Sequence, residues 1–471
     1  MKKILSYAAV FCVVLAASFF ACTPVVSASG NMGNDMPKKA EQVTFKVSCD
    51  ALPGARFSNL MDNYFQSYFE PKEDVRLNFS MTDPVSGIYC VFELPCQWTL
   101  TLPDGTVKQG GEYGAVHEYT AFDAPVTGFD IDFPQGCRIT EIYAFTDGKL
   151  PDWVQEWEPP CERADLMVMS THADDEFLWF GGAIPYYAGE LGYKVQIVYL
   201  TNHSGETYRN HELLNGLWMA GVRNYPIITD KFKDTILTRE SEEVAAQIFG
   251  RDNVREFQVE MLRRFQPKVI LGQAINGEYG HGAHILNVTT LLDALNLYED
   301  PSVFPDSAQK YGIKKVQKCY LHLWPENQIN VVWSEKKLEK FGGKNAFQMA
   351  VACYECHLSQ LKWYNEVREW GKCDCRKFGL VYTNVGYDTP GVNDMFEHVD
   401  WTEETPDEAQ VEEETENTQV VSATDAAVSA SDSVFSVFGK EISKPDICFA
   451  LIAVLLSLIS IIYVIWMERR E

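Results

Sequence analysis

The chain is short of positive charge and of histidine. Its 471 residues include 40 lysines and arginines but 66 aspartates and glutamates, which gives a formal net charge of -26. Proteins that bind DNA or RNA use Lys and Arg to neutralise phosphates, so this deficit excludes nucleic acid as a partner. Internal repeats are absent, and no sequence feature indicates an obligate protein partner. Only nine histidines are present, so a cluster of them is informative.

The N-terminus has the composition of an export signal. Residues 1–28 begin with two lysines, continue with an apolar run and end in small residues, which predicts a signal peptide cleaved after Ala28. A lipoprotein site at Cys22 is the alternative, but Phe19 and Phe20 suit it poorly. Residues 29–42 are small and polar and are expected to form a linker.

The C-terminus has the composition of a membrane anchor. Residues 447–467 carry no charge over a length that can cross a bilayer, and no LPxTG-like sorting sequence precedes them. Arg469 and Arg470 follow and predict a cytoplasmic tail at residues 468–471. The acidic residues 402–446 predict a disordered stalk. We therefore expect a single-pass protein of the cell membrane whose exported ectodomain faces outside.

Cysteines are numerous for a chain of this kind. Thirteen are present, of which ten lie outside the signal region and the apolar span. An even number in an exported chain predicts disulfides. The alternative is a four-thiolate zinc site built from "CYEC" and "CDC". The ten are Cys49, Cys90, Cys96, Cys137, Cys161, Cys319, Cys353, Cys356, Cys373 and Cys375.

Two patterns of apolar residues divide the folded part of the chain. Residues 43–150 alternate in short runs separated by turns such as "LPDGT", which predicts antiparallel strands of a β-sandwich. These segments faintly resemble galactose-binding-like sandwiches, which implies glycan binding; a spacer or stability domain is the alternative. Residues 163–401 alternate strands and helices, which predicts an α/β fold with a Rossmann-like parallel sheet and helices on both faces.

A histidine and three carboxylates follow the buried run "LMVMS" in the segment "THADDE" (171–176). Zinc accepts histidine nitrogen and carboxylate oxygen, so His172 and one aspartate could supply two ligands, and a second aspartate could take a proton from water. Alone, such an acidic run is more often a helix N-cap. Its position after a strand favours chemistry, because ligands of α/β sheets bind beyond the carboxyl ends of strands.

A second cluster follows a later predicted strand. After "VILGQAI" comes "NGEYGHGAH", which places His281 and His284 three residues apart beside Tyr279. A lone pair of histidines with this spacing is more often a packed pair. Two clusters at strand ends of one sheet are harder to explain without function, so the sequence predicts a metal site that both clusters build.

The order of these segments resembles the PIG-L/LmbE-like deacetylase family. Its members carry H-P-D-D-E, a helix containing GG, a strand ending near LT, R-x-x-E and Y-G-H-P-D-H. This chain has "HADDEFLWFGG" (172–182), "VQIVYLTNHSGETYRNHE" (195–212) and "EYGHGAH" (278–284), then "ECHLSQ" (355–360) and "FGLVYTNVGYDTPGVNDMFEHVDW" (378–401). The resemblance covers residues 163–401 and implies a metal-dependent, usually zinc-dependent, enzyme that removes acetyl groups from N-acetylglucosamine-type amides.

The resemblance also implies roles for individual residues. The implied metal ligands are His172, Asp175 and His284. The implied catalytic residues are Asp174 as the general base that activates water, His281 as the proton donor and Tyr279 as the oxyanion contact. Arg209 is the implied substrate contact and Glu212 supports the site, while Glu176 is interpreted as structural.

Two positions depart from the family pattern. Ala173 replaces a proline that stiffens the loop, and Ala283 replaces an aspartate that can orient the neighbouring histidine. Outside the motifs, His203 and His211 flank a strand end and are candidates to line the site. The remaining assignments are packed or capping roles for His322 and His357 and core roles for Trp179 and Trp218.

The function that the sequence favours is a surface-anchored, zinc-dependent N-deacetylase of an N-acetylated amino sugar or envelope glycan, with another divalent metal as an alternative to zinc. The competing hypothesis is a catalytically inactive surface protein that binds glycan.

Overall fold

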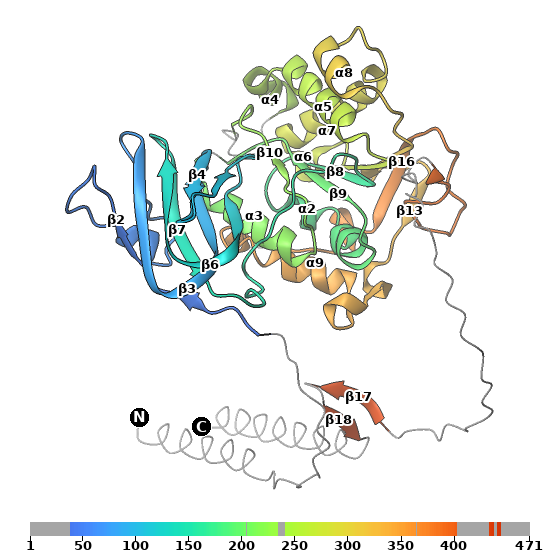
Figure 1. Cartoon of the computed structure of the whole chain (residues 1–471). Helices are drawn as coiled ribbons and strands as arrows, with labels where there is room; N and C mark the ends of the chain where they lie inside the picture. The colour runs from blue at the N-terminus through green and yellow to red at the C-terminus, as the bar shows by residue number, and fades with distance from the viewer. Residues whose placement is uncertain are drawn as a thin grey trace, which may run out of the picture. The chain divides into compact units, whose positions relative to one another are not determined.

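The computed structural model describes residues 38–203, 205–233, 241–363 and 365–402, together with the backbone of 433–437 and 440–443 (Figure 1). The predicted signal peptide, apolar span and cytoplasmic tail, and most of the linker and stalk, lie outside the described residues. Within those residues no helix is long and apolar enough to cross a membrane. Inside the stretch predicted to be a disordered stalk, β17 (Ser433–Val437) and β18 (Lys440–Ser443) pair antiparallel.

The N-terminal part is built from antiparallel strands that belong to one hydrogen-bonded sheet. Their order is β1-β7-β3-β6-β4-β5, and β2 pairs with β3. The strands are β1 (Gln42–Val43), β2 (Lys46–Ser48), β3 (Val75–Leu94), β4 (Trp98–Thr101), β5 (Val107–Gly110), β6 (His117–Phe133) and β7 (Arg138–Phe145). A short 3-10 helix, Ser58–Leu60, precedes β3.

The long strands β3 and β6 are curved, as Figure 1 shows, and their buried side chains belong to one apolar cluster. In β3 the buried Leu77 and Phe79 alternate with the more exposed Arg76 and Asn78, as expected for a strand with one face on a core. The pairing of β3 with β6 shifts register between Ser80 and Gly87, and such irregularities bend strands. Antiparallel β-structure agrees with the sequence pattern; the arrangement as two stacked sheets and the galactose-binding-like likeness remain predictions.

The second sheet is mixed rather than wholly parallel. Its order is β10-β9-β8-β11-β12-β16-β13. The first five strands pair in parallel, whereas β16 pairs antiparallel with both β12 and β13. The strands are β8 (Leu166–Ser170), β9 (Val195–Tyr199), β10 (Ile227–Ile228), β11 (Val269–Gly272), β12 (Lys318–His322), β13 (Gln328–Asn330) and β16 (Lys377–Thr383). An α/β fold was therefore correctly predicted, an all-parallel sheet was not, and the Rossmann-like assignment remains a prediction.

Helices cover both faces of this sheet (Figure 1). In β8, Leu166 and Val168 join one apolar cluster with α2, α3 and α9, while Met167 and Met169 join another with α5 and α7. Continuous apolar runs of this kind are typical of strands buried on two faces. The helices are α2 (Asp175–Leu178), α3 (Tyr208–Met219), α4 (Glu242–Phe249), α5 (Arg251–Phe265), α6 (Gly277–Gly280), α7 (Gly282–Leu297), α8 (Pro305–Tyr311) and α9 (Ala346–Tyr354).

The helical stretch expected after residue 174 is broken. The α-helix α2 ends at Leu178, and a π-helix, η2 (Pro185–Glu190), follows after a turn. Gly181 in this turn has a φ of +54°, and a Cβ on it would lie 2.6 Å from the Cys375 Sγ. The residue must therefore be glycine for the turn to pack against the segment before β16.

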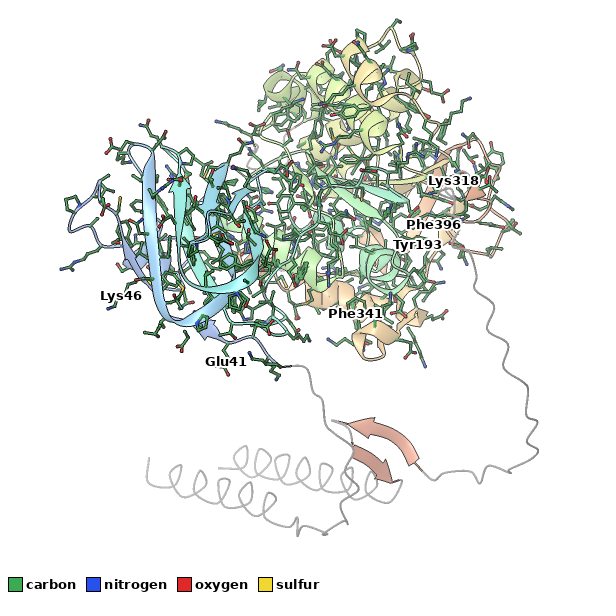
Figure 2. The ribbon with its side chains drawn as sticks, in the orientation of Figure 1. Glu41, Lys46, Tyr193, Lys318, Phe341 and Phe396 are labelled. Atoms are coloured by element: carbon green, nitrogen blue, oxygen red, sulfur yellow. The ribbon has the colours of Figure 1, made fainter. Side chains whose placement is uncertain are left out.

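The last described segment folds back onto the second sheet. The Phe396 ring packs 4.9 Å from the rings of both Tyr187 and Tyr193, and Figure 2 shows Phe396 next to Tyr193. The buried Lys318 of β12 pairs with Asp388 of the same segment. This last segment therefore packs on the second sheet.

The expectation of disulfides is not supported. All ten cysteines outside the signal region and the apolar span are free thiols. Two of them do approach each other: a hydrogen bond with Cys96, together with burial, raises the pKa of Cys137. The alternative four-thiolate zinc site is also not supported, because the cluster of possible metal ligands found in the described part of the chain contains three histidines and no cysteine.

Candidate active site

The two clusters singled out in the sequence follow neighbouring strands. β8 and β11 pair directly, in parallel, although β9 and β10 come between them in the chain. The winding of the sheet therefore reverses between β8 and β11, and such a switch point opens a crevice at the carboxyl ends of the strands. A buried hydrogen bond from Asn287 Nδ2 to Thr171 Oγ1, 3.0 Å long, links α7 to the end of β8.

Hydrogen bonds hold the loop after β8 in an unusual conformation. Asp174 has a φ of 113°, which is costly for a residue with a side chain. Its backbone N–H donates to Glu176 Oε2 over 2.8 Å, and the N–H of Ala173 donates to His203 Nε2 over 2.9 Å. The N–H of His172 donates to Asp175 Oδ2 over 2.8 Å. These bonds fix the directions of the side chains that begin α2.

The loop after β11 is held in a similar way. Glu278 has a φ of 65° and is buried. One of its carboxylate oxygens accepts the N–H of Ala274 over 2.8 Å, and the other contacts His322 Nδ1, also at 2.8 Å. Gly277 precedes it with a φ of +68°, where a Cβ would lie 2.6 Å from the Ile285 side chain. Tyr279 and His281 follow in the chain and lie directly before the start of α7.

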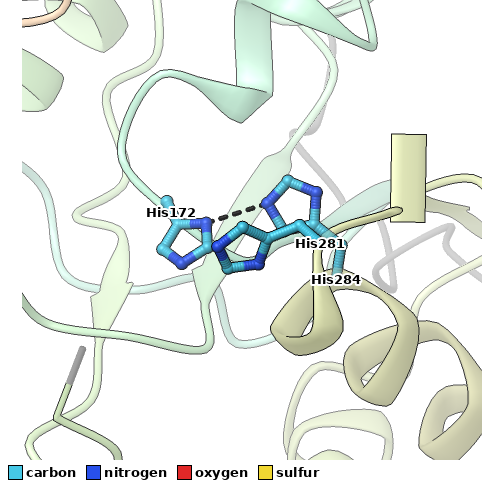
Figure 3. A group of neighbouring side chains, drawn as sticks. All are labelled: His172, His281 and His284. Atoms are coloured by element: carbon cyan, nitrogen blue, oxygen red, sulfur yellow. Dashed lines mark hydrogen bonds between the residues drawn. The ribbon is translucent and has the colours of Figure 1, made fainter. Parts of the chain in front are cut away.

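The loop after β8, the end of the loop after β11 and the first turn of α7 bring three imidazoles together, as Figure 3 shows. One nitrogen each from His172, His281 and His284 lies within 4.8 Å of the other two, and all three rings are buried. His281 was assigned the role of proton donor, yet it also offers a nitrogen to this cluster.

The residues that the resemblance implied as ligands fit a metal ion. His172 Nδ1, His284 Nε2 and Asp175 Oδ2 form a triangle with sides of 2.9, 3.2 and 3.4 Å. Donor atoms about 2.0–2.2 Å from a tetrahedral zinc lie roughly 3.3–3.6 Å apart. Two imidazoles and one carboxylate also form a known type of catalytic zinc donor set. The donor set therefore suits a divalent cation, with one side of the triangle inside this range and the other two shorter.

The two aspartates differ in their electrostatic surroundings. Burial and the charge of Asp175 raise the pKa of Asp174 to about 7, although Arg209 opposes this shift. Burial acts in the same direction on Asp175, but the adjacent His284 and His172 hold the pKa of Asp175 well below its usual range. Trp179 Nε1 also donates to Asp175 Oδ1 over 2.6 Å. One carboxylate is therefore held as an anion, while its neighbour takes up a proton near neutral pH.

The remaining predicted residues surround this centre. Arg209 donates to the carbonyl of Ala173, and its Nη2 lies 3.6 Å from Asp174 Oδ1. Glu212 accepts the N–H and the hydroxyl of Ser359 over 2.7 and 2.6 Å. The Tyr279 ring lies 5.8 and 5.6 Å from the rings of His281 and His284, and its side chain is 41% exposed.

Three residues assigned to packing or capping have closer links to the site. His357 and His322 are buried, as expected for packed residues, but each pairs at 2.8 Å with a glutamate of a site loop, Glu176 and Glu278. Trp179 is a core residue, as predicted, yet it also holds Asp175. In the sequence, the only indication of these links was that Glu176 and Glu278 lie within the two motifs "THADDE" and "EYGHGAH".

Ala283, which replaces the family aspartate, lies in an apolar environment. It is fully buried and belongs to the cluster that contains Met169 and Leu286. His211 does not lie against the three histidines; it faces the N-terminal part instead, where it contacts His117.

Comparison with known proteins agrees with the motifs. No family model matches the chain. A curated relative, 1D-myo-inositol 2-acetamido-2-deoxy-alpha-D-glucopyranoside deacetylase 2 of Saccharopolyspora erythraea, is 28% identical over 173 residues. The chain is similar to the PIG-L/LmbE-like deacetylases. The match to this relative covers 32% of the chain and 63% of the relative's length.

Two solved structures of deacetylases also align with the chain. An N,N'-diacetylchitobiose deacetylase from Pyrococcus horikoshii is 17% identical, with a TM-score of 0.31 over 43% of this chain and 74% of its own. The teicoplanin deacetylase Orf2, in a zinc-inhibited form, is 13% identical, with a TM-score of 0.29 over 45% and 88%. The predicted resemblance to PIG-L/LmbE-like deacetylases is confirmed by the sequence match.

Proposed function

We propose that this protein is a metal-dependent N-deacetylase that hydrolyses the acetamide of an N-acetylglucosamine-type amino sugar or envelope glycan. The observation that carries the proposal is the convergence of His172 Nδ1, His284 Nε2 and Asp175 Oδ2 within 3.4 Å of one another, beside an aspartate with a raised pKa. The similarity to a deacetylase of an acetamido sugar supports the substrate class.

His172, Asp175 and His284 would hold the cation. Zinc is proposed because the donors are two imidazoles and one carboxylate, with another divalent metal as the alternative. A bound cation would supply Lewis-acid polarisation of the substrate carbonyl and of water.

The side chains of the chain itself supply the proton transfers. Asp174 accepts a proton from the attacking water, a task that suits a carboxylate whose pKa is raised to about 7. His281 donates a proton to the nitrogen as the C–N bond breaks, and the Tyr279 hydroxyl donates to the oxyanion. The products are acetate and the free amine. Arg209 is proposed to contact the sugar and also orients Asp174, which lies 3.6 Å from it.

Acetate release tests the proposal. The ectodomain is purified, treated with a chelator, reconstituted with zinc and incubated with N-acetylglucosamine and with chito-oligosaccharides. Acetate should appear with the zinc-loaded protein and disappear after chelation. Tight glycan binding by a folded, zinc-loaded protein that releases no acetate from any acetamido sugar would overturn the proposal in favour of glycan recognition alone.

We also propose that this activity resides outside the cell membrane, because of the apolar residues 447–467 and the signal-like residues 1–28. Protease added to intact cells should remove the folded part and leave a membrane-bound stub. Full protection in intact cells, with cleavage only after lysis, would contradict this location.

A further inference from the structure

Helix α3 lies between the candidate active site and the N-terminal part. Near its start, Arg209 reaches the loop after β8, and Glu212 binds Ser359. His211, between these two residues, is buried and faces the opposite direction, towards β3 and β6. Residues that serve the site and a residue that serves the N-terminal part therefore alternate along a single turn of helix.

A buried chain of polar groups connects β3 to this helix. The Tyr89 hydroxyl lies 2.6 Å from His117 Nδ1, and His117 Nε2 lies 2.8 Å from His211 Nδ1. If Tyr89 donates to His117, the Nε2–H of His117 must donate to His211, because a neutral imidazole has one donor and one acceptor. Phe65 closes the group, with ring centroids 4.9 Å from His211 and 6.0 Å from His117.

Burial keeps both imidazoles neutral. It lowers the pKa of His117 well below the usual value and lowers the pKa of His211 to about 4. Each neutral imidazole then offers one donor and one acceptor to the chain. A hydrogen bond that is buried at both ends is costly to leave unmade, so loss of His117 would leave His211 Nδ1 without this partner.

Further contacts hold both ends of the helix. At its start, Thr207 Oγ1 donates to Glu93 Oε1 of β3 over 3.2 Å. Farther along, Gln155 Nε2 donates to Asn215 Oδ1 over 2.7 Å, and Trp218 Nε1 donates to the carbonyl of Asp152 over 3.0 Å. These partners come from β3 and from the segment that joins the two parts.

We propose that the N-terminal β-structure is a positioning element for the active site, and that His117 sets the placement of α3 and thereby of Arg209. The proposal rests on the proposed function and adds a role for residues 38–150. It differs from glycan tethering, which raises the local concentration of a polymer and leaves a small soluble substrate unaffected. It also differs from a spacer, which affects no substrate.

Kinetics on a monomeric substrate test the proposal. His117→Ala removes the hydrogen-bond partner of His211 Nδ1, and His117→Gln restores an amide at this position. Thr140→Val is the matched control, since it removes a buried hydrogen bond within the same β-structure, to the carbonyl of Val91, in which no residue of α3 takes part. We expect kcat/KM for N-acetylglucosamine to fall about tenfold in His117→Ala, the equivalent of one lost buried hydrogen bond. Part of this activity should return in His117→Gln, and Thr140→Val should match wild type.

The division between KM and kcat separates positioning from loss of folded protein. Displacement of Arg209 raises KM, whereas a smaller folded fraction lowers apparent kcat at unchanged KM. Gln155→Ala, which removes the contact with Asn215, should raise KM in the same direction by a smaller factor and provides a second variant if His117→Ala folds poorly. Unchanged KM in both variants would overturn the proposal.

Hydrogen exchange provides a measurement that does not depend on turnover. The amides of α3 should exchange faster in His117→Ala than in wild type, while those of α7 remain unchanged and zinc content stays equal. If wild type releases no acetate but the amides of α3 exchange faster in His117→Ala, the proposed activity is wrong and the role of His117 in placing α3 is supported. If wild type releases acetate and the amides of α3 exchange at the same rate in His117→Ala, the role of His117 in placing α3 is wrong and the proposed activity is supported.

Discussion

The loops after β8 and β11 are built on the same plan although their sequences differ. Each places a residue with a side chain at positive φ, Asp174 at 113° and Glu278 at 65°. In each, a buried glutamate accepts a backbone N–H with one oxygen and pairs with a histidine through the other, Glu176 with His357 and Glu278 with His322. Backbone strain at functional sites persists only where the surroundings enforce it, and these pairs are the enforcing contacts.

The two loops differ in their access to solvent. In the loop after β8, the residues from His172 to Glu176 are all buried. The loop after β11 exposes 41% of Tyr279 and has glycines at 277, 280 and 282. We interpret the first loop as the fixed source of ligand and base, and the second as the side that meets substrate. The same kind of glutamate–histidine pair therefore supports both the buried loop and the more exposed loop of one site.

The largest effect on activity is expected from substitution of Asp174, the proposed general base in the loop after β8. Asp174→Asn should lower kcat by between about 10²- and 10⁴-fold, the range for loss of a general base, without loss of zinc. Asp175→Asn should lose zinc as well as activity, because it removes an anionic ligand. Acetate release and metal content measured on the same preparations check both expectations. Loss of zinc in Asp174→Asn with retention in Asp175→Asn would reverse the two roles.

A smaller effect is expected on the accessible loop. Tyr279→Phe should lower kcat by about 10²-fold through loss of one hydrogen-bond donor to the oxyanion. Zinc affinity and the free energy of unfolding should stay unchanged because the side chain is partly exposed. Steady-state kinetics provide kcat, and competition with a zinc chelator provides the zinc affinity. A change confined to KM would instead assign Tyr279 to ground-state binding of the sugar.

Matched substitutions of the two glutamates test whether the supporting pairs are equivalent. Glu176→Gln and Glu278→Gln should each cost about 1–3 kcal/mol in the free energy of unfolding, because each disturbs a buried charged contact. Their kinetic effects should differ. Glu176→Gln should lower kcat through its effect on Asp174, whereas Glu278→Gln should act through the placement of Tyr279 and His281. Urea unfolding of the zinc-free proteins and steady-state kinetics measure both. Identical kinetic profiles would show that the two loops do not divide their tasks.

The strand ends of the site could be predicted from sequence because they follow local rules. The buried run at 166–170 and the polar residues directly after it predicted both a strand and a cluster at its carboxyl end. The pairs Glu176–His357 and Glu278–His322 could not be predicted, since they join residues far apart in the chain and leave no local pattern. The antiparallel β16 and the broken helix at Gly181 depend on packing between distant segments for the same reason.

The smallest expected effect concerns the pH dependence of the pair between His357 and Glu176. Burial lowers the pKa of His357, but the negative charges of Glu176, Asp174 and Glu212 outweigh it and raise the pKa above its usual value. A histidine whose pKa is raised in the folded state adds stability that is fully present below its unfolded pKa of about 6.5 and is lost as pH rises through the folded value. The stability difference between wild type and His357→Gln should therefore shrink from pH 6 towards pH 9. Urea unfolding with a chelator present measures this difference. A difference that grows with pH would mean that His357 is neutral in the folded protein, so that Glu176 alone holds the strained loop of Asp174.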